Sequence, residues 1–431
     1  MDLKKEIKLS DLLPKRSRKT DAVGQEQPNA EKPKRERKRS FGRSKTEQAQ
    51  KPQKAPKEPR AAKQPKARNA GGKSVGRRKK YVGLKIGASQ ISAAQVVNNG
   101  GPHVLQMARQ DLDPGVVVGG ELRDSEALAT SLREFFKKSG LPRGNVRLGI
   151  SNNRIGVRMF EIGGIDDPKQ LTNAIRYRAQ EVLPIPLEDA VLDYHILGEY
   201  TDGEGNLKRR VLLVVAYRDL VERYTAACRK AGIKLAGIDL EAFAILRALA
   251  PPMEDGAEPG AAALVVVSVG HDRTTFAVSD GRACQFTRVL EWGGSSLNSG
   301  IARALDLAPS EAEPIKLALS LAEPTIPAGL TSEQSDKVRE AVLHELRAFA
   351  RELVSSLQFY QSQVGSLGIG EIVLTGGTAH LPGFAAELAK LIGVRVRVGD
   401  PLANVKVAKK VDRELPLGSM AAAIGLGIES S

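Results

Sequence analysis

The stretch YVGLKIGASQIS, residues 81–92, decides the fold class of this chain. Apolar residues on either side of Gly87 have the pattern of two strands joined by a tight turn. A glycine in such a turn lets the backbone come close to a bound group, and the N–H groups of the turn suit an anion. The stretch therefore predicts a strand–turn–strand hairpin of the kind that holds a phosphate.

Two later stretches repeat parts of this pattern. ALVVVSVGHDRTTFAVSDGRACQFTRVL, residues 263–290, again places an apolar strand before a glycine turn and then resumes as a strand. EIVLTGGTAHLPGF, residues 371–384, places an apolar strand before a glycine pair and opens a helix, whose N-terminus favours negative charge. The third stretch alone is equally typical of a structural strand-to-helix turn, so the three predict a phosphate site only in combination.

Helices and strands alternate between these loops. Residues 125–140 have the apolar spacing of a helix, and Pro168, capped by Asp167, predicts the start of another. The apolar runs 190–200 and 208–217 predict two strands joined by a turn. The second helix and these strands predict a small α+β module.

The first 80 residues differ from the rest in composition. They contain 27 Lys and Arg against 9 Asp and Glu, in a chain with a net charge of +15, so the remainder is slightly acidic. Large apolar residues are rare after Leu13, which predicts a disordered segment over residues 15–79. Such a segment is either a solvated spacer or a contact for an anionic membrane surface. Its one aromatic residue is Phe41, which disfavours nucleic acid as a partner.

Signals for export and for metal binding are missing from the sequence. No apolar run approaches the ~20 residues that span a bilayer, and the N-terminus lacks the apolar core of a secretory signal. Cys228 and Cys284 make no disulfide framework, and the histidines have no metal-ligand spacing. We therefore expect a cytoplasmic protein without a metal site.

The three loops, in this order, resemble the phosphate 1, phosphate 2 and adenosine loops of actin-like ATPases. The sequence around them is similar to the PilM family of type IV pilus assembly proteins, which is itself similar to the cell-division protein FtsA. The segments that carry the similarity are RYRAQEVLPIPLEDAVLDYHIL (176–197), RVLEWGGSSLNSGIARAL (288–305), SLQFYQSQ (356–363) and TGGTAHLPGFAAELAKLIGVRVRVGDPL (375–402).

The resemblance implies an α/β protein with an actin-like fold, in which a ribonuclease H-like unit is duplicated. The first half would comprise residues 81–257, with an α+β subdomain of the FtsA and PilM type inserted at 154–217. The second half would comprise residues 258–431, with a mostly helical insertion at 300–365. Residues 1–80 would remain as the basic tail.

In this fold a nucleotide lies between the two halves. The sequence departs from the family pattern at two positions that would support the magnesium ion of the nucleotide. Lys85 and Ser268 stand where the family generally has acidic residues. Magnesium binds through carboxylates, water and phosphates, so the chain loses its support for the ion. We expect no useful ATPase activity, and a weak ATPase is the alternative. The resemblance assigns nucleotide contacts to Lys85, Gly87, Ala88, Ser89, Gln90, Ser268, Gly270, His271, Thr274, Gly293, Gly294, Thr375, Gly376 and Gly377.

Nucleotide binding is separate from hydrolysis. Backbone N–H groups of the loops can still hold phosphates, and Lys85 can replace part of the charge of magnesium. ATP without magnesium is therefore a candidate ligand. The alternative is that Lys85 pairs with a carboxylate and that the cleft holds no nucleotide.

The resemblance also implies a protein partner. Members of the PilM family are cytoplasmic scaffolds at the inner membrane that hold the N-terminal tail of PilN, which carries a motif like INLLP, in a groove beside the inserted subdomain. The alternatives are an ordinary amphipathic helix at the matching positions and, for the whole chain, a cell-division scaffold similar to FtsA. The matching wall, expected to be partly buried, would comprise Arg176, Tyr177, Gln180, Glu181, Leu183 and Pro184.

The basic tail contains a segment that resembles the partner's motif, IKLSDLLPKR at residues 7–16. We hypothesise that it docks in the groove of its own or a neighbouring molecule and competes with the partner. The alternative is a short helix that binds a membrane surface or another protein. The sequence leaves open whether the machine builds a pilus, imports DNA or exports protein. The apolar anchors and the proline of the segment are Ile7, Leu9, Leu12, Leu13 and Pro14.

Overall fold

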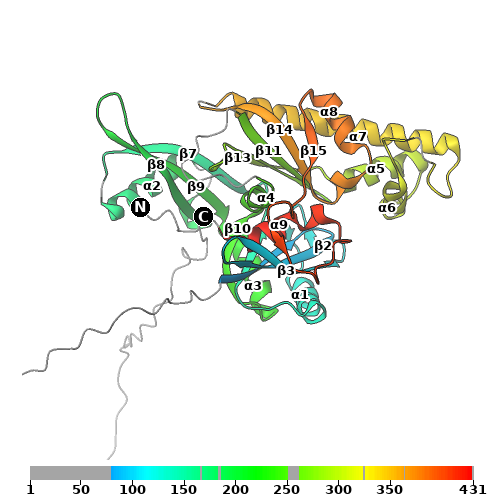
Figure 1. The fold of residues 1–431 in the computed structure, drawn as a ribbon, viewed down its shortest axis with the longest axis horizontal. Coiled ribbons are helices and arrows are strands. Elements are labelled where there is room, and N and C mark those ends of the chain that lie inside the picture. The colour runs from blue at the N-terminus through cyan, green and yellow to red at the C-terminus, as the bar shows by residue number, and fades with distance from the viewer. Residues whose placement is uncertain are drawn as a thin grey trace, which may run out of the picture. The chain divides into compact units, whose positions relative to one another are not determined.

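The computed structural model describes residues 79–165, 167–182, 186–250, 262–323, 326–363 and 365–429. Figure 1 shows their arrangement as mixed sheets with helices packed against them. Within these ranges no helix is both long enough and apolar enough to span a membrane. The tail as far as residue 78, with its motif at residues 7–14, lies outside the described residues, as do Leu183 and Pro184.

The first predicted hairpin opens a six-stranded sheet. Its strands are β1 (Lys79–Ile86), β2 (Gln90–Asn98), β3 (Pro102–Asp111), β6 (Val146–Ile150), β10 (Leu235–Leu240) and β16 (Lys406–Val407). Their order is β10-β6-β1-β2-β3-β16. β1, β2 and β3 pair antiparallel, whereas β6 runs parallel to β1 and to β10. The predicted strand–turn–strand is confirmed, and β1 begins at Lys79, inside the segment predicted to be disordered.

The second predicted hairpin opens a five-stranded sheet. Its strands are β11 (Ala262–Val269), β12 (Thr274–Ser279), β13 (Cys284–Leu290), β14 (Gly368–Thr375) and β15 (Val396–Val398). Their order is β13-β12-β11-β14-β15. β11, β12 and β13 pair antiparallel, and β14 runs parallel to β11 and β15. Without β16 and taken from the other end, the first sheet has the order β3-β2-β1-β6-β10, with the same strand directions as β13-β12-β11-β14-β15 in the second. This correspondence confirms the predicted duplication.

The α+β module forms a third sheet with its own core. It contains β7 (Ile155–Gly163), α2 (Pro168–Val182), a 3-10 turn (Leu187–Asp189), β8 (Ala190–Thr201) and β9 (Leu207–Tyr217), and its strand order is β7-β9-β8. The helix begins at Pro168 as predicted, and the carboxylate of Asp167 accepts a bond from the N–H of Lys169 at 3.0 Å. Leu171, Ile175 and Ala179 of α2 form a buried cluster with β8 and β9.

The remaining helices cover the two large sheets. The long helix α7 (Ser332–Gln361) buries a stripe of apolar residues against the second sheet, and the ring of its Phe349 stacks on Trp292 with centroids 4.0 Å apart. The remaining elements are α1 (Ser125–Ser139), α3 (Arg218–Lys230), α4 (Glu241–Leu249), α5 (Gly294–Leu305), α6 (Pro309–Ala318), α7 (Ser332–Gln361), α8 (Phe384–Ile392), α9 (Leu417–Gly427), the short strands β4 (Val117–Val118) and β5 (Glu121–Leu122), and a 3-10 turn (Thr378–His380).

The C-terminal segment differs from the predicted division of the chain. The resemblance places residues 366–431 in the second half, but β16 pairs with β3, and α9 packs on α4, β1 and β2 of the first half. The physical reason is the composition of α9, whose residues are small or apolar and buried all round. Such a helix must be covered on every side, and it lies between α4 and the first sheet.

The close approach of α9 to α4 depends on glycine at position 425. A Cβ atom there would lie 1.8 Å from the carbonyl oxygen of Ala244. We predict that Gly425→Ala destabilises the fold by roughly 2–3 kcal/mol, because the two helices must move apart. Urea unfolding followed by circular dichroism measures this. Gly144→Ala is the control, because a Cβ atom at Gly144 meets no atom within 4 Å. Equal stability of the two variants would contradict the prediction.

Candidate nucleotide cleft and partner-binding module

The turns of the two large hairpins lie together at a small cavity. Both turns close with the same bond, from Gly87 N to Gln90 O and from Gly270 N to Arg273 O, each 2.9 Å long. The cavity has a volume of about 40 Å³. The structure thus brings the first and second predicted loops together. The residues that line the cavity are Lys85, Gly87, Ala88, Ser89, Gln90, Glu241, Ser268, Gly270, His271, Asp272, Arg273 and Thr275.

The third predicted loop packs against the second one and does not line this cavity. Gly376 has a φ of 92°, and a Cβ atom there would lie 2.1 Å from the carbonyl oxygen of Val269. The hydroxyl of Thr375 and the N–H of Gly376 both donate to the carbonyl of Gly418, at the start of α9. Glycine is therefore required at position 376 for packing, and Gly377 follows it at the surface.

Three more predicted residues also support the second loop. Gly294 donates its N–H to the carbonyl of Gly270 at 2.9 Å. A Cβ atom at Gly293 would lie 2.4 Å from the carbonyl oxygen of His271. The buried hydroxyl of Thr274 donates to the carbonyl of Trp292 at 2.7 Å. These three contacts hold the backbone of the second loop in place.

Lys85 has a carboxylate partner in the cavity. Its Nζ lies 3.6 Å from Oε2 of Glu241, and the two side chains are 11% and 3% exposed. Among the described residues, Oε1 of Glu241 has no hydrogen-bond partner. Sequence reasoning missed Glu241, which follows β10 as the first residue of α4. The available signal was an acid directly after the strand that ends at Leu240.

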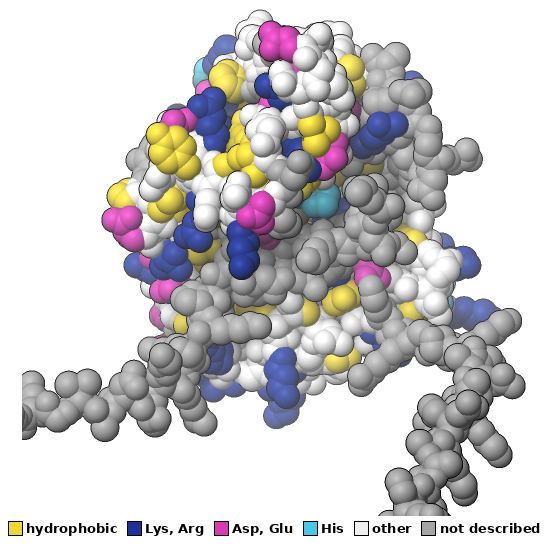
Figure 2. Space-filling model, turned by 90° about the vertical axis from the view of Figure 1, so that its left-hand side faces the viewer, with side chains coloured by type: hydrophobic (Ala, Val, Ile, Leu, Met, Phe, Trp, Pro, Cys, Tyr) yellow, Lys and Arg dark blue, Asp and Glu magenta, His cyan; other side chains and the backbone are white. Residues whose placement is uncertain are grey.

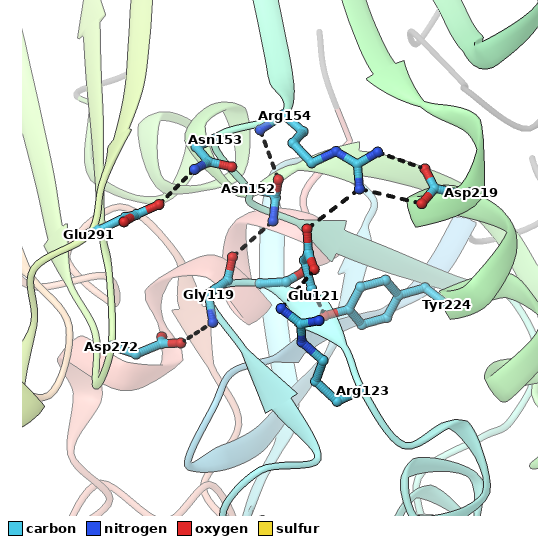
Figure 3. A network of polar contacts seen from close by, with 11 residues as sticks. Gly119, Glu121, Arg123, Asn152, Asn153, Arg154, Asp219, Tyr224, Asp272 and Glu291 are labelled. Atoms are coloured by element: carbon cyan, nitrogen blue, oxygen red, sulfur yellow. Dashed lines mark hydrogen bonds and ion pairs between the residues drawn. The ribbon is translucent and has the colours of Figure 1, made fainter.

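The second loop carries another pair of opposite charges. Nη1 of Arg273 lies 3.9 Å from Oδ1 of Asp272, and Arg273 is buried. Oδ2 of Asp272 accepts a bond from the N–H of Gly119, between β4 and β5, at 2.6 Å. Figure 3 shows this contact as one end of a chain of polar contacts.

The chain of contacts continues to the base of the α+β module. Asn152 donates to the carbonyl of Gly119 at 2.8 Å and accepts from the N–H of Arg154 at 2.8 Å. The guanidinium of Arg154 binds Asp219 at 3.2 and 3.3 Å and Glu121 at 3.4 Å (Figure 3). Arg154 precedes β7 and Asp219 follows β9, so these bonds clamp the two connections through which the chain enters and leaves the module.

A second cluster fills the space beside Gly294. Lys316 is buried, and its Nζ binds Oε2 of Glu313 at 2.7 Å and the carbonyl of Gly294 at 3.4 Å. Asn298 also donates to Oε2 of Glu313, at 2.5 Å. Burial raises the pKa of Glu313, but the bonds from Lys316 and Asn298 outweigh it and hold that pKa below its ordinary value.

Magnesium–ATP does not fit the residues of this cleft. Lys85 and Ser268, which stand where the resemblance implies metal-supporting acids, line the cavity, and its carboxylates, Glu241 and Asp272, already face cations. A cavity of about 40 Å³ has room for a few water molecules. In the part of the chain that the structure describes, no cluster of three or more His, Cys, Asp or Glu side chains could hold a metal ion.

The exposed face of α2 carries the residues predicted to bind a partner. Arg176, Tyr177, Gln180 and Glu181 are all exposed, so the expectation that part of this set is buried is wrong for these four. The reason is the helical period, which gives the buried face to Leu171, Ile175 and Ala179. Tyr177 is 66% exposed, a high value for a large aromatic side chain. Figure 2 faces this side of the molecule and shows hydrophobic side chains interspersed with charged ones.

A match to a family model shows which protein family the chain belongs to. The model of the type IV pilus assembly protein PilM matches residues 83–431. The chain belongs to the PilM family. The solved structure of a PilM–PilN type IV pilus biogenesis complex is similar at 25% identity with a TM-score of 0.68, over 81% of this chain and 98% of that one. The fold is thus the predicted actin-like α/β fold.

The sequence is also similar to the cell-division protein FtsA, as the resemblance implied. FtsA of Escherichia coli K12 is 26% identical over 366 residues, which cover 75% of this chain and 85% of FtsA. FtsA of Streptococcus pneumoniae D39 is 23% identical over 354 residues, covering 74% of this chain and 75% of FtsA. This family member therefore aligns with FtsA over most of both chains.

The cluster at Glu313 gives a pH dependence with a definite sign. A carboxyl whose folded pKa is lowered stabilises the fold above its unfolded pKa, here 4.5, and the contribution is lost as pH falls through the folded pKa. We predict that the urea midpoint of the natural protein falls more between about pH 6 and pH 3 than that of Glu313→Gln. Glu340→Gln, an exposed control, should keep the natural pH dependence. Parallel curves for the natural protein and Glu313→Gln would contradict the assignment.

Proposed function

We propose that this PilM-family protein is a scaffold of a type IV pilus assembly machine, or of a related secretion machine. In this role its α+β module holds the N-terminal tail of a PilN-like inner-membrane protein. The observation that carries the proposal is the family match over residues 83–431, together with the similarity to a solved PilM–PilN complex over 98% of that chain.

The exposed face of α2 supports this choice of binding surface. Tyr177 stands out from the helix with little neighbouring cover, and exposed tyrosines frequently become the buried anchors of protein interfaces. Arg176 and Gln180 flank it with donors, and Glu181 is engaged by Arg178 at 2.5 Å. A short extended peptide with apolar residues and free carbonyl groups is complementary to such a surface.

Scaffolding without ATP turnover is the proposed mode of action. Phosphoryl transfer needs a supported metal and an oriented nucleophile, and Lys85 and Ser268 stand where the resemblance implies the acids that support the metal. Glu241, a buried carboxylate at the cavity, faces a lysine at 3.6 Å, so it is held as an ion-pair partner. A weak ATPase and an FtsA-like division scaffold are the alternatives. The identity of 26% with FtsA over most of the chain supports the second one.

Peptide binding tests the proposal. We predict that Tyr177→Ala weakens binding of a labelled synthetic peptide containing INLLP by about tenfold or more, because the anchor is lost. Fluorescence anisotropy with the full chain measures the affinity. Tyr200→Ala is a matched control, because Tyr200 is also exposed but lies at the far end of β8. Absence of saturable binding to the natural protein, or equal loss in both variants, would overturn the proposed surface.

The basic tail is proposed to work with the same surface. Its apolar motif at residues 7–14 would compete with the partner, and its positive charge would hold the protein peripherally at an anionic inner membrane. A flexible linker of about 65 residues has an r.m.s. span on the order of 45 Å, enough to reach its own module or a neighbouring molecule.

A competition experiment tests whether the apolar motif of the tail competes with the partner. We predict that a peptide of residues 1–18 displaces the INLLP peptide and that deleting residues 1–18 increases the affinity of the chain for it, because the internal competitor is gone. The measurement is anisotropy with both peptides. A peptide with Leu12→Ser and Leu13→Ser serves as the control. Unchanged affinity after the deletion would show that the segment does not compete.

A further inference from the structure

We propose that the cleft of this chain is a ligand-independent lock, in which protein groups join the two halves where the fold family uses a nucleotide. At its centre is the ion pair of Lys85 and Glu241, which lies within the first half and lines the same cavity as the second loop. The halves are joined at its rim, by direct bonds between the first half and the second hairpin. The proposal concerns the cleft alone and stands apart from the partner-binding surface on α2.

Charge balance is the first argument. Lys85 and Glu241 face each other at 3.6 Å, and Arg273 and Asp272 face each other at 3.9 Å, all four at the same cavity. Their formal charges cancel. A triphosphate would bring several negative charges into this site, and without a metal no net positive charge of the side chains would offset them. The lysine is therefore explained as the partner of Glu241, without a bound anion.

Space is the second argument. The turns of the two hairpins leave a cavity of about 40 Å³. On the side of the second loop where Gly294 lies, a Cβ atom would already meet Oγ1 of Thr378 at 2.7 Å and Nζ of Lys316 at 3.1 Å. The hydroxyl of Thr378 donates to the carbonyl of Gly270 at 3.2 Å. Protein groups thus fill the space beside the loop on the side of Gly294.

Bonds across the cleft are the third argument. The N–H of Gly119 donates to Asp272 at 2.6 Å, and the hydroxyls of Ser151 and Thr275 are 2.8 Å apart. Each bond joins a residue beside the first sheet to a residue at the second hairpin. The Ser151–Thr275 bond is buried, so both hydroxyls would be left unsatisfied if the halves separated without water entering. These bonds hold the halves together in the way that a bridging ligand would.

The first experiment is a nucleotide titration of the full chain. ATP, with and without magnesium chloride, is added during calorimetry and during thermal unfolding. The lock predicts no saturable heat and no rise in Tm at millimolar ATP, whereas a ligand at 100 times its Kd would raise Tm by several degrees. Saturable ATP binding by the natural chain that is lost in Lys85→Met would overturn the proposal, whether or not it needs magnesium.

The second experiment is a double-mutant cycle on the ion pair. Lys85→Met alone and Glu241→Met alone each leave a buried charge without its partner, and each should lower Tm by roughly 5–10 °C. The double variant removes both charges and should recover most of the loss. Lys234→Met, at an exposed lysine, is the control and should leave Tm unchanged. Additive losses in the double variant would overturn the lock.

Hydrogen exchange distinguishes a lock from a merely local ion pair. Exchange in residues 117–122 and 270–275 should rise together in Ser151→Ala and in Lys85→Met. In the double variant with Lys85→Met and Glu241→Met, it should return to the natural rate. Should Lys85→Met not fold, the Ser151→Ala variant and the double variant still decide the outcome. Exchange that stays at the natural rate in Ser151→Ala would overturn the role of the cross-cleft bonds.

Discussion

The contact between Lys85 and Glu241 is the constraint on which the cleft depends. Lys85 lies in β1, in the interior of the first sheet, and Glu241 is the first residue of α4. Both are buried, so each makes the other necessary, because either charge alone would be costly in a site with little water. α4 packs on α9 and also contacts strands of the second sheet. The ion pair therefore ties the first sheet to the helix that borders both halves.

The hairpins and the α+β module were predictable because their signals are local. A strand, a glycine turn and a second strand lie within twelve residues, and the two turns close with the same backbone bond. The start of α2 depends on Asp167 and Pro168, which are adjacent in the chain. The exposure of Tyr177 also follows from helical periodicity, although the sequence alone did not separate the partner-facing residues from the buried ones.

The partners inside the cleft were not predictable, because they join residues that are far apart in sequence. Glu241 meets Lys85, and Asp272 meets Gly119, each across more than 150 positions. Periodicity carries no information about such pairs. It also missed the return of α9 to the first half, since a small, apolar helix fits any buried site until its neighbours are known. The one visible signal was chemical: a lysine at a position where the related fold places an acid.

The glycines and the charges of this cleft carry different kinds of information. Gly376 approaches the backbone of Val269, and Gly293 approaches that of His271, so packing requires both glycines whether or not a nucleotide binds. Glycine-rich loops in this fold are therefore evidence for the fold itself and not for a bound nucleotide. The charges are not needed for packing in the same way, because an apolar pair of similar size could replace Lys85 and Glu241. It is the balance of these charges, rather than the loops that surround them, that indicates what the cleft can hold.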